Sequence, residues 1–352
     1  MARCLVGNCI ASVAVAALLL APGALLAQDE PLLPGESPPI GALHRDANGR
    51  IEVIDPTKDQ GGGHACTAGT ICVGKGQAYA TLAAAVALAR IGDTIEILGG
   101  TYHESITVTA KNLTIRGIAG RPHLDCAGVA LAGDKGCVLL KADGVTLDNI
   151  EISGAVIADG LGGNGACIRN NGPDQSFTVR NIICHGSQEG ILSDGGAAVI
   201  ENSEFYDNGW SDSTHNVYLS GNCTATVRGS VFRDARVGHE FKSRCRKTEI
   251  SDSTFRSTKG SRNLDIPDGG ETMVYRSRLS KTPGAQNMEY IGFAAESCAH
   301  PGDMVLKDVH IENSMRDALI HNFDKCEGHP IVLQQVTVEG LPIKELGYIL
   351  RR

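Results

Sequence analysis

Histidines, cations and carboxylates recur at matching positions of a repeated pattern between residues 215 and 291. The stretch "STHNVYLSGN" places a histidine just before an alternating run, and "ARVGHEFKSRCRKTE" does so again 24 residues later. Side chains of these types can transfer protons, neutralise an acidic group or act as a carboxylate pair. The spacing therefore indicates a reactive site that is built from equivalent positions of successive repeats.

Alternation within each run assigns every second residue to the outside. Aligning "NVYLS", "EFKSR", "NLDIP" and "NMEYI" directs Tyr218, Lys242, Asp265 and Glu289 outward. Parallel strands lie about 4.8 Å apart, so these four residues are expected to form one ladder. The two histidines flank it. The candidate catalytic residues are therefore His215, Tyr218, His239, Lys242, Asp265 and Glu289.

The charge distribution predicts an anionic ligand at this place. Residues 228–281 contain 13 Lys or Arg and 7 Asp or Glu, although the whole chain has a net charge of −8. A local excess of cations on an acidic protein attracts anions. The alternative is that several of these arginines lie on other faces. The candidate substrate-binding residues are Arg244, Arg246 and Asp268.

Simpler interpretations exist for each of these residues. A histidine before a strand is commonly a hydrogen-bonding corner residue, and asparagine or aspartate at corners commonly forms turns. Lys242 between Tyr218 and Asp265 is compatible with a surface ion pair that contributes little to stability. The joint alignment of the group favours a functional site over these separate explanations.

The N-terminal sequence predicts export. Residues 1–27 combine one cation, an apolar segment and small residues, which is typical of a cleaved signal peptide. Residues 28–64 are rich in proline and glycine and are interpreted as a flexible leader. No later segment is apolar enough for a membrane span. We therefore expect a periplasmic or extracellular protein, and nucleic acid is disfavoured as a partner.

The cysteines agree with an oxidising compartment. Of the 12 cysteines, Cys4 and Cys9 belong to the predicted signal peptide, which leaves ten. An even number without a paired CxxC motif favours disulfides over zinc. Pairing between neighbours in the sequence would give Cys66–Cys72, Cys126–Cys137, Cys167–Cys184, Cys223–Cys245 and Cys298–Cys326.

The elements that must position the site come from an imperfect repeat after residue 137. Short alternating runs end at apolar residues that are 21 to 32 residues apart. The closing residues are Ile152, Cys184, Phe205, Phe232, Phe255, Leu279, Ile311 and Val338. Short strands, turn residues and a period in the twenties predict a solenoid of β coils.

The front of the domain contains an alanine-rich amphipathic segment, about residues 77–90, followed by β runs at 94–98, 106–108 and 113–116. A helix there would cover the first coil. From about residue 70 to 340 the chain resembles the right-handed parallel β-helix, or pectin lyase-like, superfamily. The resemblance implies an all-β fold: a right-handed parallel β-helix solenoid over residues 65–352 with a short N-terminal capping helix.

The resemblance implies a polysaccharide ligand but leaves several activities open. In a lyase, Lys242 or Arg244 would neutralise a sugar carboxylate while a histidine or Tyr218 moves the proton. In a glycoside hydrolase, Asp265 and Glu289 would be the carboxylate pair. The third hypothesis is glycan binding without catalysis. The lyase hypothesis is preferred.

Family motifs do not decide among these hypotheses. Gly238, His239 and Lys242 are similar to two polygalacturonase elements, but the paired aspartates of those enzymes are absent. No cofactor is implied by the sequence. Calcium is an alternative, because oxygen ligands of the type that it prefers are present. Those ligands would be Asp265, Asp268, Glu271 and Glu289.

Overall fold

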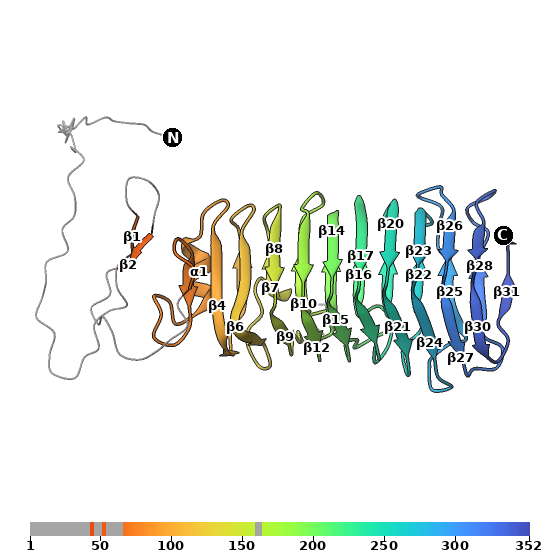
Figure 1. Cartoon of the computed structure of the whole chain (residues 1–352), viewed down its shortest axis with the longest axis horizontal. Coiled ribbons are helices and arrows are strands. Elements are labelled where there is room, and N and C mark those ends of the chain that lie inside the picture. Colours follow the sequence, from red (N-terminus) through yellow and green to blue (C-terminus); the bar gives the residue numbers. More distant parts are fainter. Residues whose placement is uncertain (1–42, 46–50, 54–65, 159–163) are drawn as a thin grey trace, which may run out of the picture. The chain divides into compact units, whose positions relative to one another are not determined.

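The computed structural model describes residues 43–45, 51–53, 66–158 and 164–352 (Figure 1). The predicted signal peptide, residues 1–27, lies outside these residues, as does most of the predicted leader at 28–64. Within that leader, β1 (Leu43–Arg45) pairs antiparallel with β2 (Ile51–Val53). In the described part of the chain, no helix has the length and apolar character that crossing a membrane requires.

Each coil contributes one strand to a ten-stranded parallel sheet, which carries the candidate site. Neighbouring strands of this sheet belong to consecutive coils of the chain, so residues about 24 positions apart become neighbours in space. Its strands are β5 (Ile106–Val108), β7 (Gly136–Leu140), β10 (Ala166–Asn170), β13 (Glu189–Ser193), β16 (Val217–Leu219), β19 (Phe241–Ser243), β22 (Leu264–Ile266), β25 (Glu289–Phe293), β28 (Leu319–Asn322) and β31 (Lys344–Leu346).

A larger, 20-stranded parallel sheet contains the remaining strands of the coils and bends between two stacks. The first stack contains β3 (Ile71–Val73), β4 (Thr94–Tyr102), β6 (Thr114–Asp125), β8 (Val145–Asp148), β11 (Phe177–Arg180), β14 (Gly196–Glu201), β17 (Cys223–Arg228), β20 (Lys247–Ser251), β23 (Glu271–Tyr275), β26 (Met304–Lys307), β29 (Ile331–Gln334) and β32 (Ile349–Arg351). The second stack contains β9 (Glu151–Ser153), β12 (Ile183–His185), β15 (Glu204–Tyr206), β18 (Val231–Arg233), β21 (Thr254–Ser257), β24 (Arg278–Lys281), β27 (His310–Asn313) and β30 (Thr337–Gly340), together with the ends of β4 and β6.

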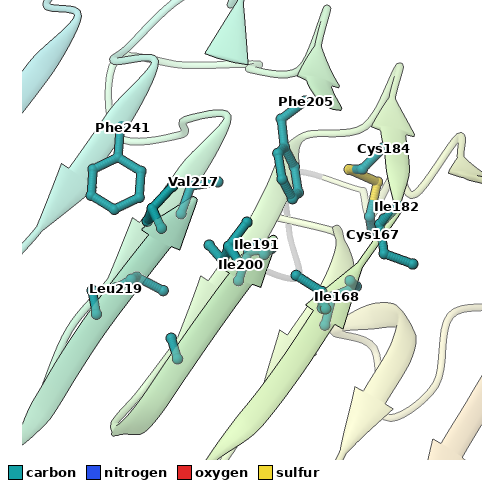
Figure 2. Packing of buried hydrophobic residues seen from close by; sticks show 14 of the residues in the cluster. Cys167, Ile168, Ile182, Cys184, Ile191, Ile200, Phe205, Val217, Leu219 and Phe241 are labelled. Atoms are coloured by element: carbon teal, nitrogen blue, oxygen red, sulfur yellow. A yellow bond between two sulfur atoms is a disulfide. The ribbon is translucent and has the colours of Figure 1, made fainter. Parts of the chain in front are cut away.

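The predicted repeat is confirmed residue by residue. All eight closing residues, from Ile152 to Val338, are register partners of their neighbours in the second stack. The rings of Phe205 and Phe232 stack at 5.4 Å, and those of Phe232 and Phe255 at 5.0 Å. Figure 2 shows Phe205 inside the coils with aliphatic residues of both sheets. The core is therefore a continuous column of side chains from successive coils.

One corner of the coil explains the recurring asparagines and aspartates. The residue three positions before each closing apolar residue has a positive φ, for example 55° at Asn149, 53° at Asn181 and 52° at Asp252. Asparagine and aspartate tolerate this left-handed conformation better than other residues with a Cβ. The corners therefore set the spacing of the strands that follow them.

The predicted helix is shorter than expected. Helix α1 (Leu82–Leu88) begins after Thr81, whose hydroxyl accepts the Ala84 N–H at 3.3 Å, and not at residue 77. The preceding residues, 77–81, form bends around an isolated β-bridge, in which Tyr79 exchanges backbone hydrogen bonds with Cys72 and Gly74. The buried face of the helix, which includes Leu82, joins the core.

All five disulfides predicted from neighbour pairing are confirmed. They are Cys66–Cys72, Cys126–Cys137, Cys167–Cys184, Cys223–Cys245 and Cys298–Cys326. Figure 2 shows the Cys167–Cys184 bond among the buried residues of the core. Disulfides at this density are typical of proteins that fold in an oxidising compartment.

Candidate active site

Three of the four predicted ladder residues form a column on the ten-stranded sheet. Tyr218 is the register partner of Lys242, and Lys242 is the partner of Asp265. The predicted position of Glu289 in this ladder is wrong, because Gly292 is the partner of Asp265 in β25. We call Tyr218, Lys242 and Asp265 the central column.

Glu289 belongs instead to a neighbouring column, three residues earlier in its strand. The members of this upstream column each stand two residues before one of a set of buried register partners, so they are equivalent from coil to coil; those partners are Ile191, Val217, Phe241, Leu264 and Ile291. The column itself consists of Glu189, His215, His239, Arg262 and Glu289. The two columns lie side by side, so Glu289 still belongs to the site.

The upstream column is a ladder of side-chain acceptors and backbone donors. The His239 N–H donates to Nδ1 of His215 at 3.0 Å, and the Arg262 N–H donates to Nδ1 of His239 at 3.1 Å. The two imidazoles stack at 4.9 Å. The His215 N–H donates in turn to the carboxylate of Glu189 at 2.8 Å, and burial raises the pKa of Glu189 well above its usual value.

This ladder restricts what the histidines can do. Burial lowers the pKa of both His215 and His239 well below the usual value for histidine, and nearby cations act in the same direction. Because Nδ1 accepts a backbone N–H in each ring, the proton of the neutral form is on Nε2. Each ring is therefore arranged to donate a hydrogen bond from Nε2. To accept a proton at Nε2, a neutral ring would have to carry its own proton on Nδ1, which would break the ladder hydrogen bond at that atom.

Arg262 joins the two columns. Its guanidinium donates to Oδ1 of Asp265 at 2.7 Å and to Oε2 of Glu289 at 2.6 Å. A Cβ at position 292 would lie 2.6 Å from Nε of Arg262, so Gly292 leaves the space that this side chain needs. His321 contacts the other oxygen of Glu289 at 2.7 Å. Both predicted carboxylates are thus held by the partly buried Arg262, and Asp265 is only 1% exposed.

Lys242 and Arg244 converge on a carboxylate that sequence reasoning missed. Nζ of Lys242 lies 3.2 Å from Oε1 of Glu296, and Arg244 bonds to the second oxygen. Although partial burial opposes the shift, the two cations hold the pKa of Glu296 below its usual value. Nε of Arg244 also donates to the hydroxyl of Tyr218 at 2.8 Å. The Glu296 side chain is half exposed, whereas that of Lys242 is only 11% exposed.

The predicted binding residues divide between this cluster and the rest of the surface. Asp268 joins the cluster, because its Oδ2 lies 2.8 Å from Nη1 of Arg244. Arg246 is exposed, and among the described residues no acidic partner contacts it. The expected basic face is not formed by the 228–281 segment as a whole. Seven of its arginines and lysines pair with acids along the larger sheet, namely Arg228, Arg233, Arg236, Lys247, Arg256, Arg276 and Arg278.

The four carboxylates considered for calcium each contact a cation. Asp265 and Glu289 are held by Arg262, and Asp268 is held by Arg244. Glu271 lies apart on β23, where it contacts Lys247 at 3.3 Å. The residues are thus arranged as ion pairs.

Beneath the columns, two ionisable groups are buried inside the coils. Glu240 is fully buried and accepts hydrogen bonds from Asn216 at 2.6 Å and Ser257 at 2.7 Å. Burial raises the pKa of Glu240 to about 8. Lys281 donates to the Glu289 carbonyl at 2.9 Å, and burial lowers the pKa of Lys281 to about 7. Both groups titrate near neutral pH under the site.

A depression adjoins the upstream column. It has a volume of about 520 Å³ and is lined by Asp212, Gly238, His239, Ser261, Gln286 and Asn287. His239 belongs to both the depression and the ladder, and its Nε2 lies 3.2 Å from Oδ2 of Asp265. The depression is therefore next to the charged cluster.

Arg262, Glu296 and His321 are the main residues that the sequence alignment missed. Arg262 has a detectable signal, because it precedes Leu264 by two positions, as His239 precedes Phe241. Glu296 has none, since it follows β25 in a segment outside the repeat. Long-range contacts from such segments leave no periodic trace in the sequence.

Solved structures similar to this chain share its fold at low sequence identity. An alginate lyase from Paenibacillus sp. str. FPU-7 is 12% identical with a TM-score of 0.54, and the match covers 76% of this chain and 96% of that one. The pectate lyase Pel9A is 14% identical with a TM-score of 0.51, covering 75% and 72%. No curated protein matches the sequence significantly.

A family model decides the classification. The model described as "Right handed beta helix region" matches residues 95–277, which is just over half of the 352 residues. The matched segment includes the central column and most of the upstream column. The parallel coils, the register of the closing residues and this match lead to one conclusion: the chain belongs to the right-handed β-helix family.

Proposed function

We propose that this protein is an exported enzyme that cleaves an acidic polysaccharide by β-elimination. In this proposal Lys242 and Arg244 bind the carboxylate of a uronic acid unit, and Tyr218 moves the proton. The five disulfides support export, because they require an oxidising compartment.

The observation that carries the proposal is the position of Glu296. Its half-exposed carboxylate lies between Nζ of Lys242 and the guanidinium of Arg244, and Tyr218 is bonded to the same guanidinium. In the proposed reaction, the carboxylate of the substrate binds to the same two cations, Lys242 and Arg244. If Glu296 moves outward, a uronate carboxylate fits in its place with the Tyr218 hydroxyl beside it.

The chemistry follows from that placement. Two cations neutralise the uronate carboxylate, so the hydrogen on the adjacent carbon becomes more acidic and the enolate-like charge is stabilised. In this proposal the Tyr218 oxygen, which accepts a hydrogen bond from Nε of Arg244, takes that hydrogen as a proton. The bond between the next carbon and the glycosidic oxygen breaks as the carbon–carbon double bond forms. Tyr218 then passes the proton that it has taken to the leaving oxygen, which restores Tyr218, and the product is an unsaturated sugar.

The hydrolase alternative is less well supported. A general acid must reach the glycosidic oxygen and carry a proton. Asp265 is 1% exposed, and both Asp265 and Glu289 are bonded to Arg262 as carboxylates. Neither is free to approach a sugar without breaking that arginine bridge. The histidines are supports in this proposal, because their Nδ1 atoms are occupied by the ladder.

A substrate panel tests the proposed reaction. Incubation with uronic acid polysaccharides and with neutral glycans is followed by ultraviolet absorbance for unsaturated ends and by a reducing-end assay. The expected result is absorbance and reducing ends rising together on a uronic acid polymer. Reducing ends without absorbance would instead indicate hydrolysis, and binding without cleavage would indicate a glycan-binding protein.

A further inference from the structure

A second cluster of ligand-type side chains lies on the larger sheet. We propose that His123, Glu151 and His185 bind a zinc ion there. The three come from β6, β9 and β12, which are neighbouring strands of three successive coils. The cluster is on a different sheet from the central column.

The register places all three side chains on the outside. Each ligand has a buried neighbour in the sequence, and these neighbours, Leu124, Ile152 and Cys184, are register partners in successive coils. Alternation therefore directs His123 and Glu151, which precede their buried neighbours, and His185, which follows Cys184, to the outside. His123 and Glu151 are register partners, whereas His185 is the partner of Ser153, two positions after Glu151. Their side chains are 24% to 30% exposed, so an ion can reach them from solvent.

The distances suit one metal ion. Oε1 of Glu151 lies 3.0 Å from Nε2 of His185 and 4.0 Å from Nε2 of His123. The ligand atoms of all three residues lie within 4.8 Å of one another. Tetrahedral zinc with bonds of about 2.0–2.1 Å separates its ligand atoms by about 3.4 Å. Small side-chain rotations would bring the three atoms to that spacing.

The donor set selects the kind of metal. Two imidazoles with one carboxylate are a zinc set that leaves a fourth position for water or another ligand. Calcium and magnesium prefer oxygen donors and are disfavoured here. The hydroxyl of Ser153 lies 2.7 Å from Nε2 of His123 and is a further oxygen beside the three ligands. The proposed site is therefore a His₂Glu zinc site with one position open.

Two features hold the ligands in place. His185 directly follows Cys184, whose disulfide to Cys167 fixes β12, and its ring stacks on Tyr206 at 4.8 Å. The guanidinium of Arg233 lies over the Tyr206 ring, 4.0 Å from the ring centre. A bound zinc would connect three coils through side chains, in a solenoid whose coils contact only their neighbours.

An ordinary ion pair is the competing explanation. His329 and Asp303 form such a pair at 2.8 Å, with a single imidazole. That pair supplies a matched control, because His329→Ala removes a histidine with an acidic partner but no second histidine. The His–Glu–His cluster differs from it by offering two imidazoles to the same carboxylate oxygen.

Calorimetric titration of zinc chloride into tag-free, chelator-treated full-length protein tests the site. We expect one equivalent of zinc per chain and a rise in Tm on binding. His123→Ala and Glu151→Gln should each weaken binding by at least about tenfold and abolish the Tm rise. His329→Ala should bind zinc as the wild type does. Circular dichroism confirms that each variant is folded, and Glu151→Gln preserves the shape of the side chain.

Two results would overturn the proposal. The first is a wild-type protein that takes up no zinc. The second is zinc binding that persists with wild-type affinity in both His123→Ala and Glu151→Gln, which would place the ion elsewhere.

Discussion

Tyr218 is the residue of the central column that combines partial exposure with a cation on its hydroxyl. We expect Tyr218→Phe to reduce the rate of unsaturated product formation by about 10²–10⁴, because the proton-transfer group is lost. The Tm should change little, since the ring and its contact with His215 remain. Tyr206→Phe, on the larger sheet, is the matched control and should retain wild-type activity. Equal rates in both variants would exclude Tyr218 as the proton-transfer group.

Glu240 makes stability depend on pH. Its pKa is about 8 in the folded protein, and that of an unfolded glutamate is about 4.5. Between these values the folded state binds more protons, so the free energy of unfolding falls as pH rises. Lys281, with a pKa of about 7, is charged in both states below that pH and adds no slope there.

Urea unfolding at pH 5 and pH 7 measures this effect. The free energy of unfolding of the wild type should fall between pH 5 and pH 7 by roughly 2 kcal/mol more than that of Glu240→Gln, because the neutral amide does not titrate. Glu271→Gln, at an exposed glutamate, should show no such change. A constant difference between Glu240→Gln and the wild type across this range would contradict the assigned pKa.

Among the elements, the segment after β25 decides whether the cations are available. Glu296, which lies in this segment, forms ion pairs with Lys242 and Arg244. We expect Glu296→Gln to bind acidic oligosaccharides more tightly, by about three- to tenfold, because a competing anion is removed. Glu312→Gln, an exposed glutamate on β27, is the control. Affinity measured by calorimetry should fall instead if Glu296 itself contacts the sugar, and that result would contradict the displacement model.

The strands of the coils could be predicted well because burial fixes their pattern. Alternation places the closing residues inside, and a one-residue slip would expose all of them. The same reasoning failed at Glu289. Asn287 precedes β25 as Asn263 precedes β22, but β25 begins two residues after its asparagine and β22 begins one residue after. It also failed to foresee that Lys242 is nearly buried, since the residue that covers it, Glu296, is 54 positions away. Periodicity predicts contacts between coils but does not predict how a connecting segment folds over them.

At the scale of the whole molecule, the disulfides connect coils that contact only their neighbours. Cys223 follows the strand of Tyr218, and Cys245 directly follows Arg244, so this bond joins the two halves of the proposed carboxylate site. Cys167–Cys184 closes a similar length of chain, 17 residues against 22, but lies among earlier coils. The two bonds therefore offer a comparison at similar cost in chain entropy.

Removing each pair separates local from global effects. We expect both Cys223→Ala/Cys245→Ala and Cys167→Ala/Cys184→Ala to lower the free energy of unfolding by about 2–4 kcal/mol, measured in urea. Binding of acidic oligosaccharide should weaken in the first variant only, because a solenoid transmits loosening mainly to adjacent coils. Equal binding losses in both variants would show that the coils respond as one cooperative unit. In that case the site would depend on the stability of the whole solenoid and not on the bond beside Arg244.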